Sequence, residues 1–283
     1  MNSGNNDILN IIENRALKNR ARVAIGIREP TEKLISSVNA AHNGRYAHVV
    51  LVGDRSKIRE FDTELDIIDT QNPEKMLASL LVSRKVDAAV RGTAHASGAL
   101  ANLKQSLKME SIQRLALLIT ASGNCFFLAP VGIDETGSIA DRINFILNGA
   151  RHISRFGIEP SVGILSGGRL GDLGRDSRVD RTLADADFIT NRLHEKGINA
   201  KHYTILIEDA IKEANFIFAP DGISGNLIFR TLVFLGGGDG IGAPVLMDDY
   251  VFVDTSRVGG HYTKAIMLAS ALADISDTSE IDF

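Results

Sequence analysis

The segment SVGILSGGRLGDLGRDSRVDR, residues 161–181, decides the fold class. Its first residues form a short apolar run, and such a run bounded by turn residues is typical of a buried strand. The run ends in a turn rich in Gly and Arg, and a helical stretch follows. Open α/β sheets bind ligands at turns of this kind, outside the carboxyl ends of their strands. The segment therefore predicts an α/β protein with an anion-binding turn.

The chemistry of this turn favours an anionic ligand. Glycine allows close backbone approach, so that successive N–H groups converge on an oxyanion, and arginine adds bidentate donors. The candidate substrate-binding residues are Ser166, Gly167, Gly168 and Arg169. The order of a Walker A loop is not present. The alternative is a surface loop in which the four Arg and three Asp residues of 166–181 pair with one another.

Outward from this segment, short apolar runs alternate with stretches of helical period. Alternation of this kind predicts βαβ units and parallel-rich, doubly covered sheets. Helices are expected at 31–44 and 73–85, after an N-cap at Ser138, and at 261–275. The expected strands are RVAIGI at 22–27, HVVLVG at 48–53, LDIID at 65–69, VDAAVRG at 86–92, ALLIT at 116–120, NCFFLAP at 124–130, SVGILSG at 161–167, AKHYTILI at 200–207, ANFIFAPD at 214–221, APVLMDD at 243–249 and VFVDTSR at 251–257.

The length of 283 residues predicts two domains, because domains usually hold roughly 150 residues. We expect a first α/β domain at 1–130 plus 249–283 and a second at 131–248. No long Pro- or Ser-rich linker separates them, so short hinges near 130–135 and 248–253 are expected.

Composition restricts the class of ligand and the compartment. A net charge of −4 gives no general attraction to nucleic acid or to an anionic membrane, so a small anionic metabolite is the expected partner. The single cysteine, Cys125, excludes an internal disulfide and favours a reducing cytoplasm. The N-terminus lacks a signal-peptide h-region and no window reaches ~18 apolar residues, so we expect a cytoplasmic protein that neither spans nor crosses a membrane.

A second candidate site is APDGISGN at 219–226, at the end of an apolar run. Asp221, Ser224, Gly225 and Asn226 suit the start of a helix, and exposed N–H groups at a helix N-terminus bind phosphate. Helix capping alone is the alternative explanation of these residues, and the two roles are compatible.

A third candidate site is DAAVRGTAHASGAL, where Arg91 and Thr93 follow an apolar run. A guanidinium in such a carboxyl-end loop is well placed for phosphate or carboxylate. His95 is either a catalytic histidine or, as the alternative, a solvated histidine of the loop. The seven histidines show no paired ligand spacing, and the Asp248–Asp249 pair is weak evidence for a metal, so no metal is predicted.

The glycines of LGGGDGIGAP, at 235–244, match the spacing of a dinucleotide fingerprint. The fingerprint has to follow a strand and open a helix, whereas here a helical stretch precedes the glycines and Pro244 is expected to lead into a strand. NAD binding is therefore not expected.

Four collinear segments resemble the phosphate acetyl/butyryltransferase family: VDAAVRGTAHASGAL, RFGIEPSVGILSGGR, FIFAPDGISGNLIFRTLVFLGGGDGIGAPVLM and VDTSRVG. The resemblance implies the two-lobed isocitrate/isopropylmalate dehydrogenase-like (phosphotransacetylase) fold with an inter-lobe cleft, in which an acyl phosphate and a thiol meet. The family's first lobe receives the C-terminal helix, and the family implies a homodimer.

A narrower resemblance is to the methanogenesis marker protein 4 group, related to methyltransferase subunit X, which carries the "AVRGT" and "SGGRxGDxGRD" versions of the loops. It implies an association with methanogenic archaea and with methyl-transfer enzymes as partners. No methyl-donor site is recognisable in the sequence.

The DxSR segment matches residues that the family uses in catalysis. By that match, Ser256 positions the reacting group and Arg257 holds the phosphate, where donors stabilise developing charge. A hinge cap and a salt bridge are the alternative roles. Where the acetyltransferases have an aspartate base, this chain has Thr263, which cannot accept a proton in that role. His261 and Tyr262 are the nearby candidate substitutes, and the candidate catalytic residues are Ser256, Arg257 and His261.

Three functions stay open from the sequence. The first is a group transferase that binds a phosphorylated or CoA-type small molecule, with CoA or an acyl phosphate as substrate. The second is a methyltransferase or an accessory subunit of methyl transfer in methanogenesis. The third is a non-catalytic ligand-sensing protein of the same fold, suggested by Thr263.

Overall fold

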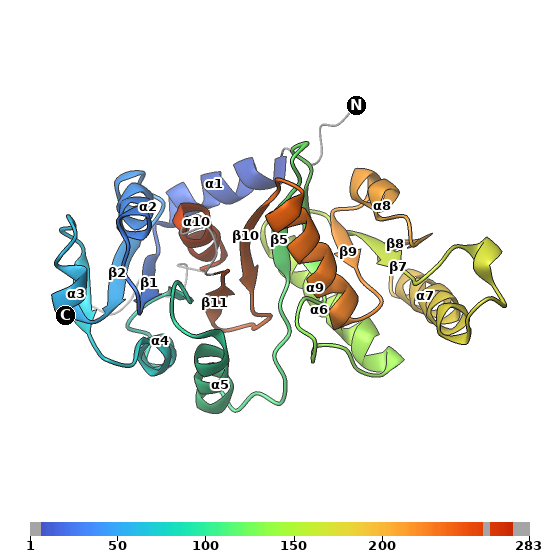
Figure 1. The fold of residues 1–283 in the computed structure, drawn as a ribbon, viewed down its shortest axis with the longest axis horizontal. Coiled ribbons are helices and arrows are strands. Elements are labelled where there is room, and N and C mark those ends of the chain that lie inside the picture. The colour runs from blue at the N-terminus through green and yellow to red at the C-terminus, as the bar shows by residue number, and fades with distance from the viewer. Residues whose placement is uncertain (1–6, 257–260, 274–283) are drawn as a thin grey trace. The chain divides into compact units, whose positions relative to one another are not determined.

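The computed structural model describes residues 7–256 and 261–273 of the chain. Two compact units divide the chain. Unit 1 holds Met1–Leu9 and Gln113–Gly240, and unit 2 holds Asn10–Ile112 and Ile241–Phe283. The α/β fold class with parallel-rich sheets is confirmed (Figure 1).

The sheet of unit 2 has the strand order β3-β2-β1-β4-β11-β10. The pairs β3–β2, β2–β1, β1–β4 and β4–β11 are parallel, and β11–β10 is antiparallel. The carboxyl ends of the five parallel strands therefore meet at one edge. The bounds are β1 (Arg22–Ile27), β2 (His48–Gly53), β3 (Asp66–Asp69), β4 (Ala88–Val90), β10 (Asp239–Pro244) and β11 (Val251–Asp254).

Helices cover both faces of this sheet. Figure 1 shows α2 and α10 on one side and α4 and α5 on the other, and each pair is also in mutual contact. Asn19 of α1 donates to the Ser270 and Ala273 carbonyls, at 3.0 and 2.7 Å, and so fixes α1 to the end of α10. The helices are α1 (Asp7–Asn19), α2 (Glu32–Asn43), α3 (Arg55–Ile58), α4 (Pro73–Val82), α5 (Ala96–Ser106) and α10 (Thr263–Leu272).

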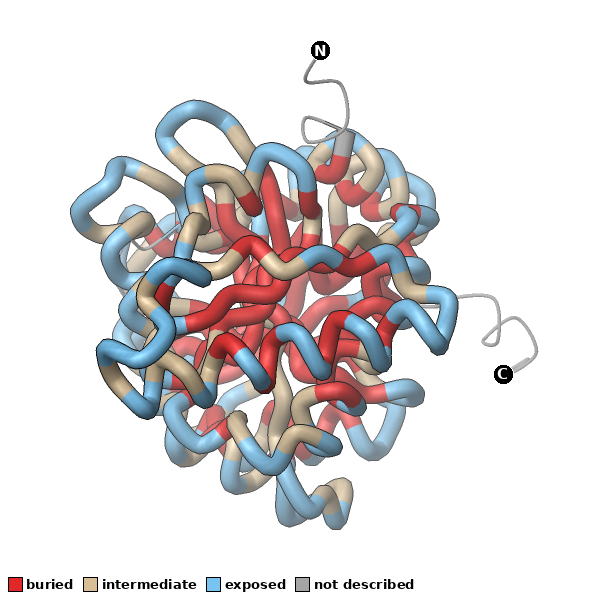
Figure 2. Tube along the Cα trace, turned by 90° about the vertical axis from the view of Figure 1, so that its right-hand side faces the viewer, coloured by how far each residue is buried: buried red, intermediate tan, exposed pale blue. Residues whose placement is uncertain are grey.

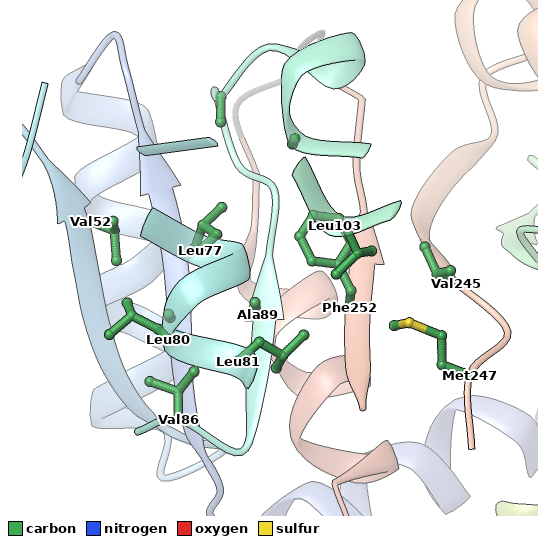
Figure 3. Packing of buried hydrophobic residues seen from close by; sticks show 13 residues of the cluster. Val52, Leu77, Leu80, Leu81, Val86, Ala89, Leu103, Val245, Met247 and Phe252 are labelled. Atoms are coloured by element: carbon green, nitrogen blue, oxygen red, sulfur yellow. The ribbon is translucent and has the colours of Figure 1, made fainter. Parts of the chain in front are cut away.

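The core of unit 2 on the α4–α5 face follows from the periodicity of strands and that of helices. Every second residue of a strand faces the same side, and α4 and α5 present leucines at helical spacing. Figure 3 shows Leu77, Leu80 and Leu103 packed over Ala89 and Phe252. These side chains are almost completely excluded from water, which is the main stabilising term for this layer.

The sheet of unit 1 has the strand order β5-β6-β9-β7-β8. The β5–β6 hairpin is antiparallel, and β6–β9, β9–β7 and β7–β8 are parallel. Figure 2 shows this part of the chain with red, buried strands and helices that alternate between red and pale blue, as amphipathic helices do. The bounds are β5 (Ala116–Ile119), β6 (Cys125–Ala129), β7 (Ser161–Leu165), β8 (Asn199–Thr204) and β9 (Phe216–Phe218).

Three helices of unit 1 begin where the sequence provides caps. Ser138 caps α6 and forms a capping box with Asp141, as the N-cap prediction requires. Asp176 caps α7 and Asp221 caps α9. The elements are α6 (Ile139–Arg155), η1 (Leu170–Asp172), α7 (Ser177–Glu195), α8 (Ile207–Glu213), α9 (Gly222–Arg230) and the π-helical turn η2 (Thr231–Leu235).

The compact units divide at 112/113 and 240/241, whereas the sequence suggested boundaries at 130/131 and 248/249. The difference comes from the β5–β6 hairpin. Its strand β6 pairs with β9, so 113–130 lies with unit 1. The inter-lobe cleft stays a prediction.

Two expected strands have other bounds in the structure, and one helix was not expected. The run expected as a strand to 207 stops at Thr204, whose φ of 57° is outside the β region, and Ile207 begins α8. The strand expected at 243–249 lies earlier, at 239–244, so Pro244 ends it. The helix at 7–19 was not expected. As expected, a helical segment precedes the glycines at 236–238, where a dinucleotide fingerprint needs a strand.

In the described ranges, no helix is long and apolar enough to cross a lipid bilayer.

Candidate functional site

The candidate site residues of unit 2 lie at the carboxyl edge of its parallel strands. Val90 of β4 is in register with Ile25 of β1 and with Val253 of β11. The residues that follow these strands therefore lie side by side at one edge. They include Arg28, Arg91, Thr93 and Ser256.

Arg91 is buried, with 5% of its surface exposed. Its Nε donates to the Asp254 carboxylate, which is also buried, and its Nη1 donates to the Ala94 carbonyl at 2.8 Å. The predicted phosphate-binding guanidinium thus joins the end of β4 to the end of β11. Asp254 was not singled out by the sequence analysis, although it opens the DxSR segment.

Thr93 and its neighbours form a second polar cluster at this edge. The Thr93 hydroxyl accepts the Arg28 N–H at 2.9 Å. Glu74 accepts the Arg28 guanidinium through two bonds, at 2.9 and 2.6 Å, and the His95 N–H at 2.7 Å. Arg28 keeps 33% of its side chain exposed. It is a cation at the edge that the sequence analysis missed, because its only signal was a position one residue past a strand.

The pKa of Glu74 is lowered to about 2. Burial alone would raise this pKa, but the hydrogen bonds from Arg28 and from the His95 N–H outweigh the burial, because they stabilise the carboxylate. Glu74 is therefore a permanent anion at neutral pH.

The predicted catalytic residues Ser256 and His261 lie between the end of β11 and the start of α10. The Tyr262 hydroxyl donates to the Ser256 carbonyl at 3.5 Å, so the amino end of α10 lies beside the end of β11. His261 is exposed, and Ser256 is partly exposed. Arg257 lies outside the described residues.

Thr263 occupies the position of the acetyltransferase aspartate, and its hydroxyl donates to the Ser37 carbonyl at 2.8 Å. The Tyr262 N–H donates to the Ser37 hydroxyl at 3.1 Å. An aspartate at 263 would place a carboxylate against a carbonyl oxygen. The Thr263 side chain thus connects α10 to α2.

The glycine-rich turn of unit 1 follows β7, and nearby side chains satisfy several of its hydrogen-bonding groups. The Gly167 N–H donates to the Thr182 hydroxyl at 2.8 Å, and the Arg169 N–H donates to Asp172 at 2.9 Å. Three of the four arginines of the loop pair with aspartates: Arg175 with Asp172, Arg178 with Asp176, and Arg181 with Asp185. Arg169 is exposed, and its guanidinium makes no ion pair with any residue in the described ranges. It is therefore an exposed cation of the turn that no ion pair in the described ranges occupies, whereas Arg175, Arg178 and Arg181 are exposed but paired.

Ser166 lies in a chain of hydrogen bonds that the sequence analysis did not foresee. Its hydroxyl is 2.9 Å from Nε2 of His202, and Nδ1 of that ring is 2.6 Å from the Asp187 carboxylate. His202 lies on β8 and Asp187 on α7. A polar residue in an otherwise strand-like run was the only sequence signal.

The APDGISGN segment packs α9 against the loop after β6. A Cβ at Gly222 would lie 1.8 Å from the Gly132 carbonyl oxygen, and a Cβ at Gly225 would lie 1.8 Å from that of Pro130. Asp221 accepts the Ser224 N–H at 2.7 Å, and the Asn226 amide donates to the Val131 carbonyl at 2.8 Å. These contacts support the capping alternative. Ser224 adds a hydroxyl-bearing side chain in the first turn.

Glu135 holds the loop that α9 contacts. Its buried carboxylate accepts the Val131 and Gly132 N–H groups, each at 3.0 Å, and the Arg114 guanidinium at 2.5 Å. The loop is therefore fixed by a charged group within unit 1.

The structure brings the predicted site residues together in two groups. Arg91, Thr93, Ser256 and His261 lie in unit 2. Ser166, Gly167, Gly168 and Arg169 lie after β7 in unit 1, and Asp221, Ser224, Gly225 and Asn226 lie after the neighbouring strand β9. Convergence of the two groups on one ligand stays a prediction. The part of the chain that the structure describes holds no cluster of three His, Cys, Asp or Glu side chains suited to a metal ion.

No protein-family model matches the chain. The chain is 66% identical, over 95% of its length and 96% of the relative's, to a Methanosarcina mazei protein named "Putative methyltransferase mtx subunit X". A protein of the same name from Methanosarcina acetivorans is 68% identical, over 94% of this chain and 95% of the relative. The chain belongs to the mtx subunit X family. A more distant relative of the family, named as an uncharacterized methyltransferase, comes from Methanocaldococcus jannaschii and is 39% identical over 71% of this chain and 83% of its own.

Solved structures confirm the fold predicted for this mtx subunit X family member. The EutD phosphotransacetylase from Staphylococcus aureus superposes with a TM-score of 0.67 at 17% identity, over 94% of this chain and 98% of that one. A branched-chain phosphotransacylase from Enterococcus faecalis gives a TM-score of 0.66 at 16% identity, over 89% and 97%. The expected phosphotransacetylase fold is therefore confirmed.

Replacing Gly225 with Ala will destabilise unit 1 by about 1–3 kcal/mol, because the added methyl group meets a backbone oxygen that cannot move independently. Urea denaturation measures the change. Gly171→Ala is the control, since no atom lies within 4 Å of its added Cβ. Equal stability of the two variants would contradict the close approach of α9 to Pro130.

Glu74→Gln will lower stability at neutral pH, because the Arg28 pair loses its anion. A carboxyl whose folded pKa is depressed stabilises the fold above its unfolded pKa, and this contribution is lost as pH falls through the folded value. The stability gap between wild type and variant will therefore be constant above pH 4.5 and will shrink as pH falls from 4.5 toward about 2. Urea midpoints measured from pH 7 to pH 2 test this. A gap that does not change with acidification would show that Glu74 is not the depressed group.

Proposed function

We propose that the chain is a group transferase that binds a phosphorylated or CoA-type small molecule. The observation that carries the proposal is the gathering of polar side chains at the carboxyl ends of parallel strands in each unit, on a fold shared with phosphotransacetylases. Ligands of open α/β sheets bind at such ends. The net charge of −4 makes a local set of donors necessary for any anion.

The accessible cations suit phosphate oxygens. Arg169 follows the Ser-Gly-Gly turn with its guanidinium exposed, and Arg28 offers a partly exposed one. Arginine binds phosphate and carboxylate in a bidentate geometry. Arg91 contributes indirectly, because its bond to Asp254 sets the position of Thr255 and Ser256.

In an acyl transfer, the thiol sulfur attacks the carbonyl carbon of an acyl phosphate, the thiol proton passes to a base, and phosphate leaves. Thr263 is bonded to a carbonyl oxygen and is no base. His261, exposed directly before α10, is the candidate base, and Ser256 is the candidate donor to the reacting oxygen.

Methyl transfer is the second candidate function, and the names of the Methanosarcina relatives favour it. In that case the chain acts as a subunit beside methyl-transfer enzymes, in the cytoplasm of a methanogenic archaeon. The third candidate function is ligand binding without turnover, as Thr263 suggests. Three observations separate these candidate functions: co-purification with methyl-transfer enzymes, methyl turnover with a pterin or corrinoid donor, and ligand binding without turnover.

Calorimetry with phosphate, acetyl phosphate and CoA tests the first candidate. We expect saturable binding of at least one, and Arg169→Ala will weaken it about tenfold, because a charge-assisted hydrogen bond is lost. Arg192→Ala is the control, since this exposed arginine pairs with Glu195 at the far end of α7. No binding of any of the three compounds to the wild-type chain would reject the proposal.

A homodimer is proposed as well, through α9 and η2. Ile223, Leu227 and Leu235 of this segment are 61%, 60% and 85% exposed. Arg230 is its only charged side chain, and the guanidinium stacks over Phe234 at 5.1 Å from the ring centre. Such a mainly apolar surface with a single charged side chain suits a two-fold contact.

Leu227→Glu will convert the dimer to a monomer, because the contact would bring two buried carboxylates together. Light scattering after size exclusion measures the mass. Phe188→Glu, an equally drastic change at a half-exposed position of α7, serves as control and will leave the dimer intact. A wild-type chain that is monomeric at high concentration would exclude the contact.

A further inference from the structure

The hydrogen-bond chain through Ser166, His202 and Asp187 connects the surface of unit 1 to its glycine-rich turn. Asp187 keeps 58% of its side chain exposed, the His202 side chain 9%, and Ser166 is 2% exposed. Besides facing His202, the Ser166 hydroxyl donates to the Gly168 carbonyl at 3.1 Å. The series of hydrogen bonds therefore ends at the Gly168 carbonyl, on the backbone of the turn.

Counting protons shows which charge of the His202 ring is compatible with all three hydrogen bonds at once. The Gly168 carbonyl accepts only, so the single hydroxyl proton of Ser166 points to it. Nε2 of His202, 2.9 Å from the same hydroxyl oxygen, must then supply the other proton. The Asp187 carboxylate also accepts only, so Nδ1 needs a proton as well. All three bonds form together only with a doubly protonated His202.

A neutral ring breaks this arrangement. With one proton, on the nitrogen that faces Asp187, Nε2 becomes an acceptor. The Ser166 hydroxyl then has to choose between Nε2 and the Gly168 carbonyl. The lock on the turn is lost when the hydroxyl donates to Nε2, while Ser166 stays hydrogen-bonded with either acceptor.

We propose that His202, oriented by Asp187, is a positioning residue that closes the Ser166–Gly168 turn when its ring is protonated and releases the Gly168 carbonyl when the ring is neutral. The imidazolium also adds positive charge beside Ser166, which opens the Ser-Gly-Gly turn. Both effects favour an anion at the turn as pH falls. The link to ligand binding rests on the proposed function, whereas the switch itself does not.

The groups around the ring support this assignment. Asp187 of α7 meets Nδ1. Lys201 and Tyr203 precede and follow His202 on β8, so their side chains point to the opposite face, where both bond to Glu213 of α8. On the turn itself, Asp172 is held by Arg175 and by the Arg169 N–H, at 2.5 and 2.9 Å.

The same three residue types form the triads of serine hydrolases, but the burial is reversed here. A nucleophile has to reach its substrate, and the 2% exposure of Ser166 prevents this. The exposed member is the carboxylate. The geometry thus suits control of the turn rather than attack on a carbonyl.

Nuclear magnetic resonance on the full chain, with histidine and glycine labelled with nitrogen-15, tests the switch without any ligand. The ring nitrogens of His202 and the amides of Gly167 and Gly168 will shift with one common midpoint during a pH titration. His202→Gln will abolish the glycine transition. Asp187→Asn will change it, because Nδ1 of the ring loses the carboxylate that orients it. Asp209→Asn, which removes a surface carboxylate of α8 paired with Lys212, is the control and will leave it unchanged.

Sulfate, which keeps its charge across this range, probes the coupling to binding. The affinity of the wild-type chain for sulfate will fall about fivefold from the acid to the basic side of the glycine transition. This is the factor that one hydrogen bond provides. His202→Gln will show a flat profile. If the glycine transition is present and no sulfate binds, the anion role fails with the proposed function and the switch stands.

Two results would overturn the switch. One is a His202 ring that titrates while the Gly167 and Gly168 amides do not change. The other is covalent labelling of Ser166 by a fluorophosphonate, since this requires an accessible, activated hydroxyl.

Discussion

The buried ion pair between Arg91 and Asp254 is the contact on which unit 2 depends. The chain leaves this unit after Ile112 and re-enters it at Ile241, so β11 and α10 come from a distant part of the sequence. Arg91 and Asp254 join the end of β4 to the end of β11, with 6% and 9% of their side chains exposed. Removing one partner of such a pair leaves an uncompensated charge in the interior, at a cost of about 3–5 kcal/mol. The pair therefore favours a single register for the returning strand.

That register also determines the position of the candidate catalytic residues. The Asp254 carboxylate accepts the Thr255 N–H at 2.9 Å, and the Thr255 hydroxyl donates to the Gly92 carbonyl at 3.3 Å. Ser256 is the next residue. Arg91, expected from the sequence to hold the ligand, holds the backbone that leads to Ser256. Arg28, which is held by Glu74, is the more exposed cation of the two.

Much of the fold could be read from the sequence, because buried parallel strands are short apolar runs and helices have caps. β1 and β2 have the predicted bounds, and Ser138 is the predicted cap. The limits of β8 and β10 were wrong, since a left-handed residue at Thr204 and an antiparallel partner for a glycine-containing strand leave little trace in composition.

The candidate sites were less predictable than the fold, because the residues that contact one another there are far apart in the sequence. The Asp254 partner of Arg91 lies 163 positions away in the sequence, and the pairing of Ser166 with His202 and Asp187 joins three elements.

The only cysteine of the sequence has a practical consequence. Cys125 lies within β6 with no measurable exposure, so it does not react readily with thiol reagents in the folded chain. A spin label or fluorophore attached to one surface cysteine introduced in each unit would therefore have no competing background. The native chain is thus suited to measuring the distance between its halves in solution, with and without an added metabolite.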